Sequence, residues 1–300
     1  MIKAAVNLLL AAQNSDGGWG WTRERNSTTE CSSLALLALA ALNDDTQGIA
    51  IRGGLDWLIQ RQNEEGSWAL NGSVAAPSWA TAIAMLALNP WPKYHRQVVK
   101  AGKWVLTQEG KKPGLLANLL LALSFQKKPV TLNENLIGWP WMPGTFSWIE
   151  PTSYFLIALK RIRPYLTGSN VDERIKQGES MIYDRMCNGG GWNYGNSVVY
   201  GENLWPYADI TAVALIALQN HRDIRENRVS FIALQRMLKE ENSGLALSWS
   251  AICYEIYGEN PDYLHKLLMS GFEATGFLGE TKTLALCILA LAGGAKYFRI

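Results

Sequence analysis

Three carboxylates occupy the same place in a recurring pattern and could carry acid–base chemistry. Glu30, Glu150 and Asp209 each stand two residues before a hydroxyl, where an apolar helical segment begins. A carboxyl group that is removed from water stays protonated at higher pH and can act as a general acid. Carboxylates also favour helix N-termini for electrostatic reasons alone, worth about 0.3–1 kcal/mol each. Both interpretations of the three residues are open at this stage.

Aromatic residues are concentrated around the same helix starts. Their ring faces could stabilise a cation that forms during a reaction. The alternative is that the rings only staple loops and fill the core. The residues concerned are Trp139, Trp141, Phe146, Trp148, Tyr154, Phe155, Trp192, Tyr194, Trp205 and Tyr207.

The apolar segments repeat along the chain and predict buried helices. Each starts with a small or hydroxyl residue and is apolar nearly all round, which is typical of an inner helix. These segments cover 29–43, 78–89, 150–160 and 209–219. More charged helices with a single apolar stripe alternate with them and indicate an outer layer. They cover roughly 2–13, 49–62, 95–107, 172–186 and 225–239.

Gly-Trp loops, such as "QNEEGSWAL" at 62–70, join outer helices to inner ones. About twelve helices and no convincing strand pattern predict six hairpins that close into a ring. We therefore expect an all-α fold, a single (α/α)6 barrel over residues 1–300. All inner helices of such a barrel begin at the same end, so Glu30, Glu150 and Asp209 should ring one mouth.

The bulk composition excludes several classes of protein. A net charge of +2 and the lack of a basic tract argue against nucleic acid as a partner. The apolar runs are shorter than the roughly 18 residues that a membrane-spanning helix needs. We interpret the first residues as a helix of the fold rather than a signal peptide. Four cysteines without a C-x-x-C pair favour a reducing compartment, so we expect a cytoplasmic protein.

The loops carry a specific resemblance. "GLDWLIQRQNEEGSW" at 54–68 resembles the QW motif of squalene-hopene and oxidosqualene cyclases, and "AAQNSDGGWGW" and "CNGGGWNYG" look like degenerate copies. This resemblance implies the barrel that terpene cyclases share with the β-subunits of protein prenyltransferases. Short bacterial proteins with squalene-cyclase repeats and a single barrel look most similar to this chain.

The resemblance also implies a place for an acid. Class II cyclases carry an Asp-x-Asp-Asp-Thr motif whose middle Asp protonates an alkene or epoxide. Alignment on Thr152 puts Glu150 at that position, with Trp148 and Pro151 in place of two of the acidic residues. Glu150 is then the candidate catalytic acid and Asp209 a supporting carboxylate. The candidate substrate-binding residues are Trp148, Tyr154, Trp141, Phe146, Trp192, Tyr207 and Glu30.

The metal sites of the relatives have no counterpart in the sequence. Asp184 and Cys187 precede a Gly-Trp loop, whereas the zinc ligands of the prenyltransferases follow it, and no His opens the matching inner helix. An Asp-Asp-x-x-Asp motif for magnesium is also missing. We therefore expect no metal and no cofactor.

Three functions remain open. The first is a class II terpene-cyclase-like enzyme, an isomerase that binds an isoprenoid in the barrel and starts cyclisation or isomerisation by protonation. The second is a non-catalytic barrel that binds a lipid or a peptide. The third is a subunit that requires a protein partner. Lys111, Lys112, Lys127 and Lys128 also leave open a peripheral contact with an anionic membrane.

Overall fold

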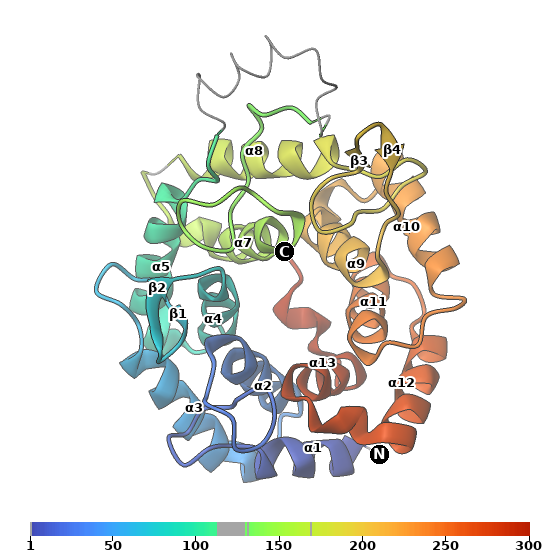
Figure 1. Ribbon diagram of the computed structural model, residues 1–300. Helices are drawn as coiled ribbons and strands as arrows, with labels where there is room; N and C mark the ends of the chain where they lie inside the picture. The colour runs from blue at the N-terminus through green and yellow to red at the C-terminus, as the bar shows by residue number, and fades with distance from the viewer. Residues whose placement is uncertain (1, 113–129, 131, 169) are drawn as a thin grey trace.

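A computed structural model describes residues 2–112, 130, 132–168 and 170–300. The twelve α-helices in these ranges form two concentric rings (Figure 1). The inner ring consists of α2 (Thr29–Ala41), α4 (Ala80–Leu88), α7 (Ile149–Ile162), α9 (Ala208–Ala217), α11 (Gly244–Tyr257) and α13 (Thr281–Leu291). The outer ring consists of α1 (Ile2–Ala11), α3 (Gly48–Gln60), α5 (His95–Thr107), α8 (Val171–Asp184), α10 (Arg225–Met237) and α12 (Asp262–Thr275).

Each inner helix packs against the next, and α13 packs against α2 to close the ring. The inner helices are mostly buried: every residue of α4 is buried, as is all of α2 except Ala40. Outer helices bury one stripe, such as Leu55, Trp57 and Leu58 in α3. The amphipathic outer layer therefore covers an inner layer that has no polar face. The all-α barrel that the repeats predict is confirmed.

The Gly-Trp loops join the two rings through one repeated set of hydrogen bonds. The backbone N–H of Trp19, Trp68, Trp139 or Trp192 donates to a hydroxyl in the next inner helix. The acceptors are Ser32, Thr81, Thr152 and Thr211, at 2.8, 2.9, 2.9 and 3.0 Å. Each indole N–H donates in turn to a carbonyl of the preceding outer helix. The buried polar groups are thus satisfied while each large ring fills the space between the layers.

The glutamine of the QW motif bonds the backbone of the next outer helix. Gln62 Nε2 donates to Gln97 O in α5 at 3.0 Å and to Gly66 O in its own loop at 2.9 Å. Gln13 repeats this arrangement with Ala50 O in α3 at 2.9 Å. A glutamine at the end of one outer helix therefore fixes both its loop and the neighbouring hairpin.

The structure departs from the predicted elements in two places. Two short antiparallel hairpins lie in the connections, formed by β1 (Ala69–Asn71) with β2 (Val74–Pro77) and β3 (Val198–Val199) with β4 (Glu202–Asn203). Strands of two to four residues are too short to show a period-two pattern in the sequence.

The second departure concerns the start of α7. The helix predicted over 150–160 begins one residue earlier, at Ile149, with Trp148 as its N-cap, so Glu150 lies in its first turn. Pro151 is tolerated there because the first N–H groups of a helix have no intrahelical acceptor.

The last residues lie across the end of the barrel where the inner helices finish. Gln219 Nε2, beyond α9, donates to Phe298 O at 2.9 Å, and Arg299 Nη2 donates to Glu255 O of α11 at 3.0 Å. Arg161 of α7 donates to Lys296 O and Arg299 O. Short 3₁₀ helices complete the elements: Asp45–Gln47, Pro92–Tyr94, Arg163–Tyr165, Gln219–His221, Gly276–Gly279 and Gly294–Tyr297.

The cysteines, the apolar helices and the four lysines named in the sequence analysis can be checked against this structure. All four cysteines are buried and free. In the part of the chain that the structure describes, no helix is both long enough and apolar enough to span a bilayer. Lys111 and Lys112 are exposed, whereas Lys127 and Lys128 lie outside the described residues.

Candidate active site at one end of the barrel

The first turns of four inner helices bring charged side chains together at one end of the barrel. Glu30, Glu150, Asp209 and Lys282 are each the second residue of α2, α7, α9 and α13. We call these four residues the polar cluster and call this end of the barrel its N-terminal end. Lys282 Nζ lies 2.7 Å from Glu30 Oε1 and 4.0 Å from Glu150 Oε1.

The carboxyl group of Glu150 is strongly affected by its surroundings. Burial raises its pKa to about 7, Lys282 opposes this rise, and the charges of Glu30 and Asp209 add to it. The Tyr154 hydroxyl, one turn further along α7, donates to Glu150 Oε1 at 3.2 Å and favours the charged form. At neutral pH a large fraction of Glu150 is therefore protonated, as a general acid requires.

Glu30 and Lys282 form a buried ion pair beside Glu150. Their side chains are 2% and 13% exposed. Burial disfavours the charged form of Lys282, but the two glutamates outweigh this effect and raise its pKa. The second oxygen of Glu30, Oε2, is buried without a hydrogen-bond partner. Lys282 thus stays charged and is directed mainly at Glu30, so that Glu150 keeps its raised pKa.

Asp209 lies at the edge of the cluster and is partly exposed. The Tyr194 hydroxyl, from the loop between α8 and α9, donates to Asp209 Oδ2 at 3.1 Å. Asp209 acts on Glu150 through its charge, because its field raises the pKa of the Glu150 carboxyl.

Aromatic rings fill the barrel interior next to Glu150. Tyr154 stacks on Trp79 with ring centroids 5.5 Å apart and contacts Trp249 at 5.8 Å. Trp141 adds an edge contact to Trp79, and Phe298 from the end of the chain contacts Trp249. We call these five residues the aromatic column. It crosses from the loop before α7 to the opposite end of the barrel.

Known proteins resemble this chain in sequence over limited segments. The squalene-hopene cyclase C-terminal domain family matches residues 1–73. The squalene–hopene cyclase of Alicyclobacillus acidocaldarius is 33% identical over 114 residues, which are 37% of this chain and 17% of that protein. The enzyme of Zymomonas mobilis is 36% identical over 78 residues, 22% of this chain and 12% of that protein. The matched segments thus span less than a fifth of the curated relatives.

Solved structures extend the likeness to the whole chain. The type II terpene cyclase MstE from Scytonema superposes on this chain with a TM-score of 0.63 at 14% identity. The superposition covers 99% of this chain and 98% of MstE. Residues 1–73 are therefore similar to the squalene-hopene cyclase C-terminal domain family, and the whole chain shares the fold of this terpene cyclase.

The same fold also occurs in other enzymes. An α-1,6-mannanase of Salegentibacter has a TM-score of 0.63 at 9% identity, covering 99% of this chain and all of that one. The Candida albicans protein geranylgeranyltransferase-I, solved with GGPP, has a TM-score of 0.50 at 12% identity, covering 78% and 67% of the two chains. At these identities the structures share the fold alone, so the chemistry must be argued from this protein's own residues.

The predicted aromatic residues fall into four groups. Tyr154 and Trp141 belong to the aromatic column. Trp148 and Tyr207, the N-caps of α7 and α9, are 36% and 54% exposed beside the polar cluster. Phe146 is 52% exposed in the loop before α7.

Trp192 lies away from the cluster. It is fully buried, and its indole N–H donates to Ile182 O of α8 at 2.7 Å. We assign Trp192 to the packing of the α8–α9 hairpin and not to a ligand site, because the layers on both sides enclose its ring.

The sequence analysis missed two residues of the site. Trp79 stands two residues before Thr81, as Glu30 stands two residues before Ser32, so a comparison of all repeat starts would have found it. Lys282 is the second residue of its helix, as Glu30 is, but Leu284 stands where those two repeats have a hydroxyl. The search for carboxylates alone passed over them.

The described residues contain no group of three or more His, Cys, Asp or Glu side chains that could hold a metal ion. Asp184 was considered above as a possible zinc ligand. In the structure, its Oδ2 accepts a hydrogen bond from the backbone N–H of Asn133 at 3.0 Å.

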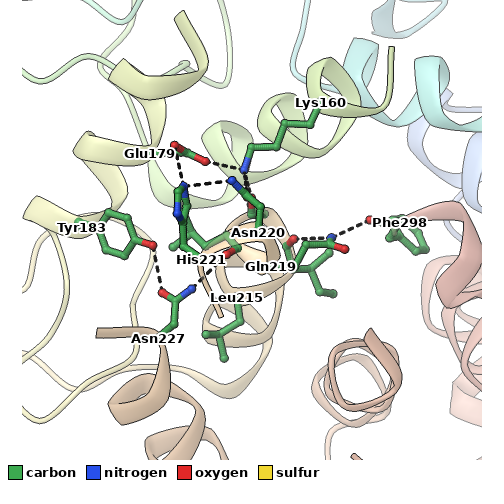
Figure 2. A network of polar contacts seen from close by, with 12 residues as sticks. Lys160, Glu179, Tyr183, Leu215, Gln219, Asn220, His221, Asn227 and Phe298 are labelled. Atoms are coloured by element: carbon green, nitrogen blue, oxygen red, sulfur yellow. Dashed lines mark hydrogen bonds and ion pairs between the residues drawn. The ribbon is translucent and has the colours of Figure 1, made fainter. Parts of the chain in front are cut away.

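A second polar network lies at the opposite end of the inner helices (Figure 2). Lys160 Nζ of α7 lies 2.6 Å from Glu179 Oε1 of α8 and donates to Ala217 O at the end of α9. His221 Nε2 lies 3.3 Å from Glu179 Oε2, and Asn220 accepts from Lys160. Burial lowers the pKa of Lys160, and Glu179 opposes that effect. The network joins three helices, and its central pair is buried, with Lys160 and Glu179 side chains 5% and 12% exposed, which fits a structural role.

Proposed function

We propose that the protein binds an isoprenoid at the N-terminal end of the barrel and isomerises or cyclises it after protonation by Glu150. The observation that carries this proposal is the buried Glu150 carboxyl, whose pKa is raised to about 7 beside an aromatic ring. A general acid works best when its pKa lies near the working pH.

The reaction would begin with proton transfer from Glu150 to the oxygen of an epoxide or an allylic alcohol. The C–O bond then breaks and leaves a carbocation, which the electron-rich face of Trp148 can stabilise.

From an epoxide, the oxygen stays on the product as a hydroxyl, and return of a proton from the cation to the Glu150 carboxylate forms an alkene and completes an isomerisation. From an allylic alcohol, the broken C–O bond releases water; loss of a proton then completes a dehydration, whereas addition of that water at the other end of the allylic cation completes an isomerisation. No oxidant or reductant is consumed in either case. An epoxide or allylic alcohol is a better substrate than a bare alkene, because a carboxyl group with a pKa of about 7 is a weak acid.

The roles of the other cluster residues follow from their charges. Asp209 supports the acid because its negative charge favours the protonated form of Glu150. Lys282 acts in the opposite direction, and its pairing with Glu30 at 2.7 Å limits that effect.

The test is incubation with farnesol, geranylgeraniol and oxidosqualene, followed by product analysis by gas chromatography and mass spectrometry. Glu150→Gln should remove product formation, since the amide keeps the shape but has no acidic proton. Glu226→Gln is the matched control, because Glu226 also lies in a first helical turn but is exposed on α10. Products formed at the full rate by Glu150→Gln would refute the role of Glu150.

A second candidate is a barrel that binds an isoprenoid or another lipid without reaction. The aromatic column favours it, because Tyr154 and Trp249 are each 1% exposed and leave little room for a reaction inside the barrel. Saturable binding in the same incubations, without any product from the unaltered protein, would select this candidate.

A further inference from the structure

The interior beside Glu150 is occupied by the protein's own side chains. Tyr154 lies on α7 and Trp249 on α11, and α9 separates these helices in the inner ring (Figure 1). Their contact at 5.8 Å therefore crosses the interior of the barrel. Trp79 on one side and Phe298 on the other extend this contact, and both are buried. A hydrocarbon chain along the barrel axis would have to displace these rings.

A groove outside the barrel offers an apolar surface instead. It has a volume of about 330 Å³ and lies between the start of α7 and the connection from α8 to α9. Four aromatic side chains line it: Trp148, Tyr194, Trp205 and Tyr207. They are 36%, 41%, 84% and 54% exposed. Small-molecule sites have about 300–1,000 Å³ and mostly apolar walls, so the groove lies at the small end of that range.

Three residues that line the groove are tied to the polar cluster by sequence or by a hydrogen bond. Trp148 precedes Glu150 by two residues at the start of α7, and Tyr207 precedes Asp209 by two at the start of α9. The Tyr194 hydroxyl donates to Asp209 at 3.1 Å, so one wall of the groove ends on a carboxylate. Ile149 N–H donates to Tyr194 O at 2.9 Å and fixes the two walls relative to each other.

A glycine keeps the groove wall in place. A Cβ at Gly195 would lie 2.8 Å from two ring atoms of the Trp148 indole. This distance is too short for a contact, so any side chain there would push the indole away. Gly195 thus allows the indole of Trp148 to lie flat against the loop that follows α8.

We infer that the hydrocarbon chain of the isoprenoid lies in this aromatic groove, outside the barrel, with its oxygen-bearing end at Glu150 and Asp209. The inference rests on the proposed function for the class of ligand and adds its position and size. A volume of about 330 Å³ selects a short chain such as farnesol over a triterpene. The exposed rings of Trp205 and Tyr207 cover the apolar chain, and the carboxyl groups receive its polar end.

Photoaffinity labelling tests the position. A farnesol analogue that carries a benzophenone at the end of its chain is irradiated with the protein, and the labelled peptides are mapped by mass spectrometry. We expect label on 192–207 and at Trp148, and excess farnesol should compete with it. Label on the peptides of Trp79, Trp249 or Phe298 would overturn the inference but leave isoprenoid binding intact. Absence of labelling that farnesol can displace would overturn both the inference and the proposed function.

Variants of the groove give an independent measurement. Trp205→Ala should weaken farnesol binding by about tenfold or more, because an exposed indole can leave without disturbing the core and its contact area is lost. Trp21→Ala is the control, since Trp21 is 42% exposed but does not line the groove. Equal affinity in Trp205→Ala and the unaltered protein would refute the position. Binding that depends on Trp205 without any product would keep the position and refute the acid role of Glu150.

Discussion

Lys282 and Glu30 join the two inner helices at which the ring closes. The ammonium of Lys282 on α13 lies 2.7 Å from a carboxylate oxygen of Glu30 on α2. Both side chains are buried, so their charges have lost most of their hydration. In such a place the pair contributes little net stability, but either charge left alone is costly.

Replacement of Lys282 should therefore destabilise the fold strongly. We expect Lys282→Met to lower the free energy of unfolding by about 3–5 kcal/mol, because Glu30 keeps its charge without a partner or must take up a proton. Urea denaturation measures this change. The double variant Lys282→Met with Glu30→Gln should recover much of the loss. A single variant as stable as the unaltered protein would contradict a buried pair.

Glu150 should make stability fall as the pH rises. Its pKa is raised from 4.5 to about 7 in the folded state, so the folded protein binds more protons than the unfolded chain between these values. The free energy of unfolding should then decrease between pH 4.5 and pH 7, by a few kcal/mol in order of magnitude. Urea denaturation at pH 5 and pH 8 should show this loss, and Glu150→Gln should reduce it. The same pH dependence in both proteins would exclude Glu150 as its source.

Removal of the Tyr154 hydroxyl should raise the pKa of Glu150 further. Its hydrogen bond favours the charged carboxylate, and Tyr154→Phe removes that bond while the ring contacts with Trp79 stay. Carbon-13 NMR titration of labelled glutamate, with Glu150→Gln to assign the signal, measures the shift. A decrease in the pKa would show that the hydroxyl acts in another way. Tyr154→Phe should also lower the free energy of unfolding by about 0.5–1.5 kcal/mol, since it removes one buried hydrogen bond.

Loss of the ion pair between Lys160 and Glu179 should lower the free energy of unfolding far more than loss of a similar pair on the surface. Lys160→Met leaves the buried Glu179 without its closest cation and should lower the free energy of unfolding by about 3–5 kcal/mol (Figure 2).

Arg163→Met is the matched control for this prediction. It breaks the pair with Asp172, which also joins the α7 end to α8 but is 59% and 66% exposed. That variant should cost less than about 1 kcal/mol. Equal costs in the two variants, measured by urea denaturation, would show that burial does not set the difference.

The sequence determined the two layers of helices, the loops that join them and the end of the barrel where chemistry is expected. These features are local and periodic: an apolar segment without a polar face must be buried, and a hydroxyl 13 residues after Trp19, Trp68 and Trp139 accepts from the backbone of each. The predicted gathering of Glu30, Glu150 and Asp209 follows from this periodicity, because equivalent positions of a repeat lie at the same height in the ring.

Only the tertiary structure decided which groups face one another around the ring. Lys282 is 252 positions from Glu30 in the sequence, and no local pattern marks it as the partner of that carboxylate. The filled interior likewise depends on Tyr154 meeting Trp249 across the barrel, and on Phe298 packing against Trp249. Contacts of this kind arise when the ring closes. The pKa of Glu150 depends on them too, because burial and the charges of three other helices set it.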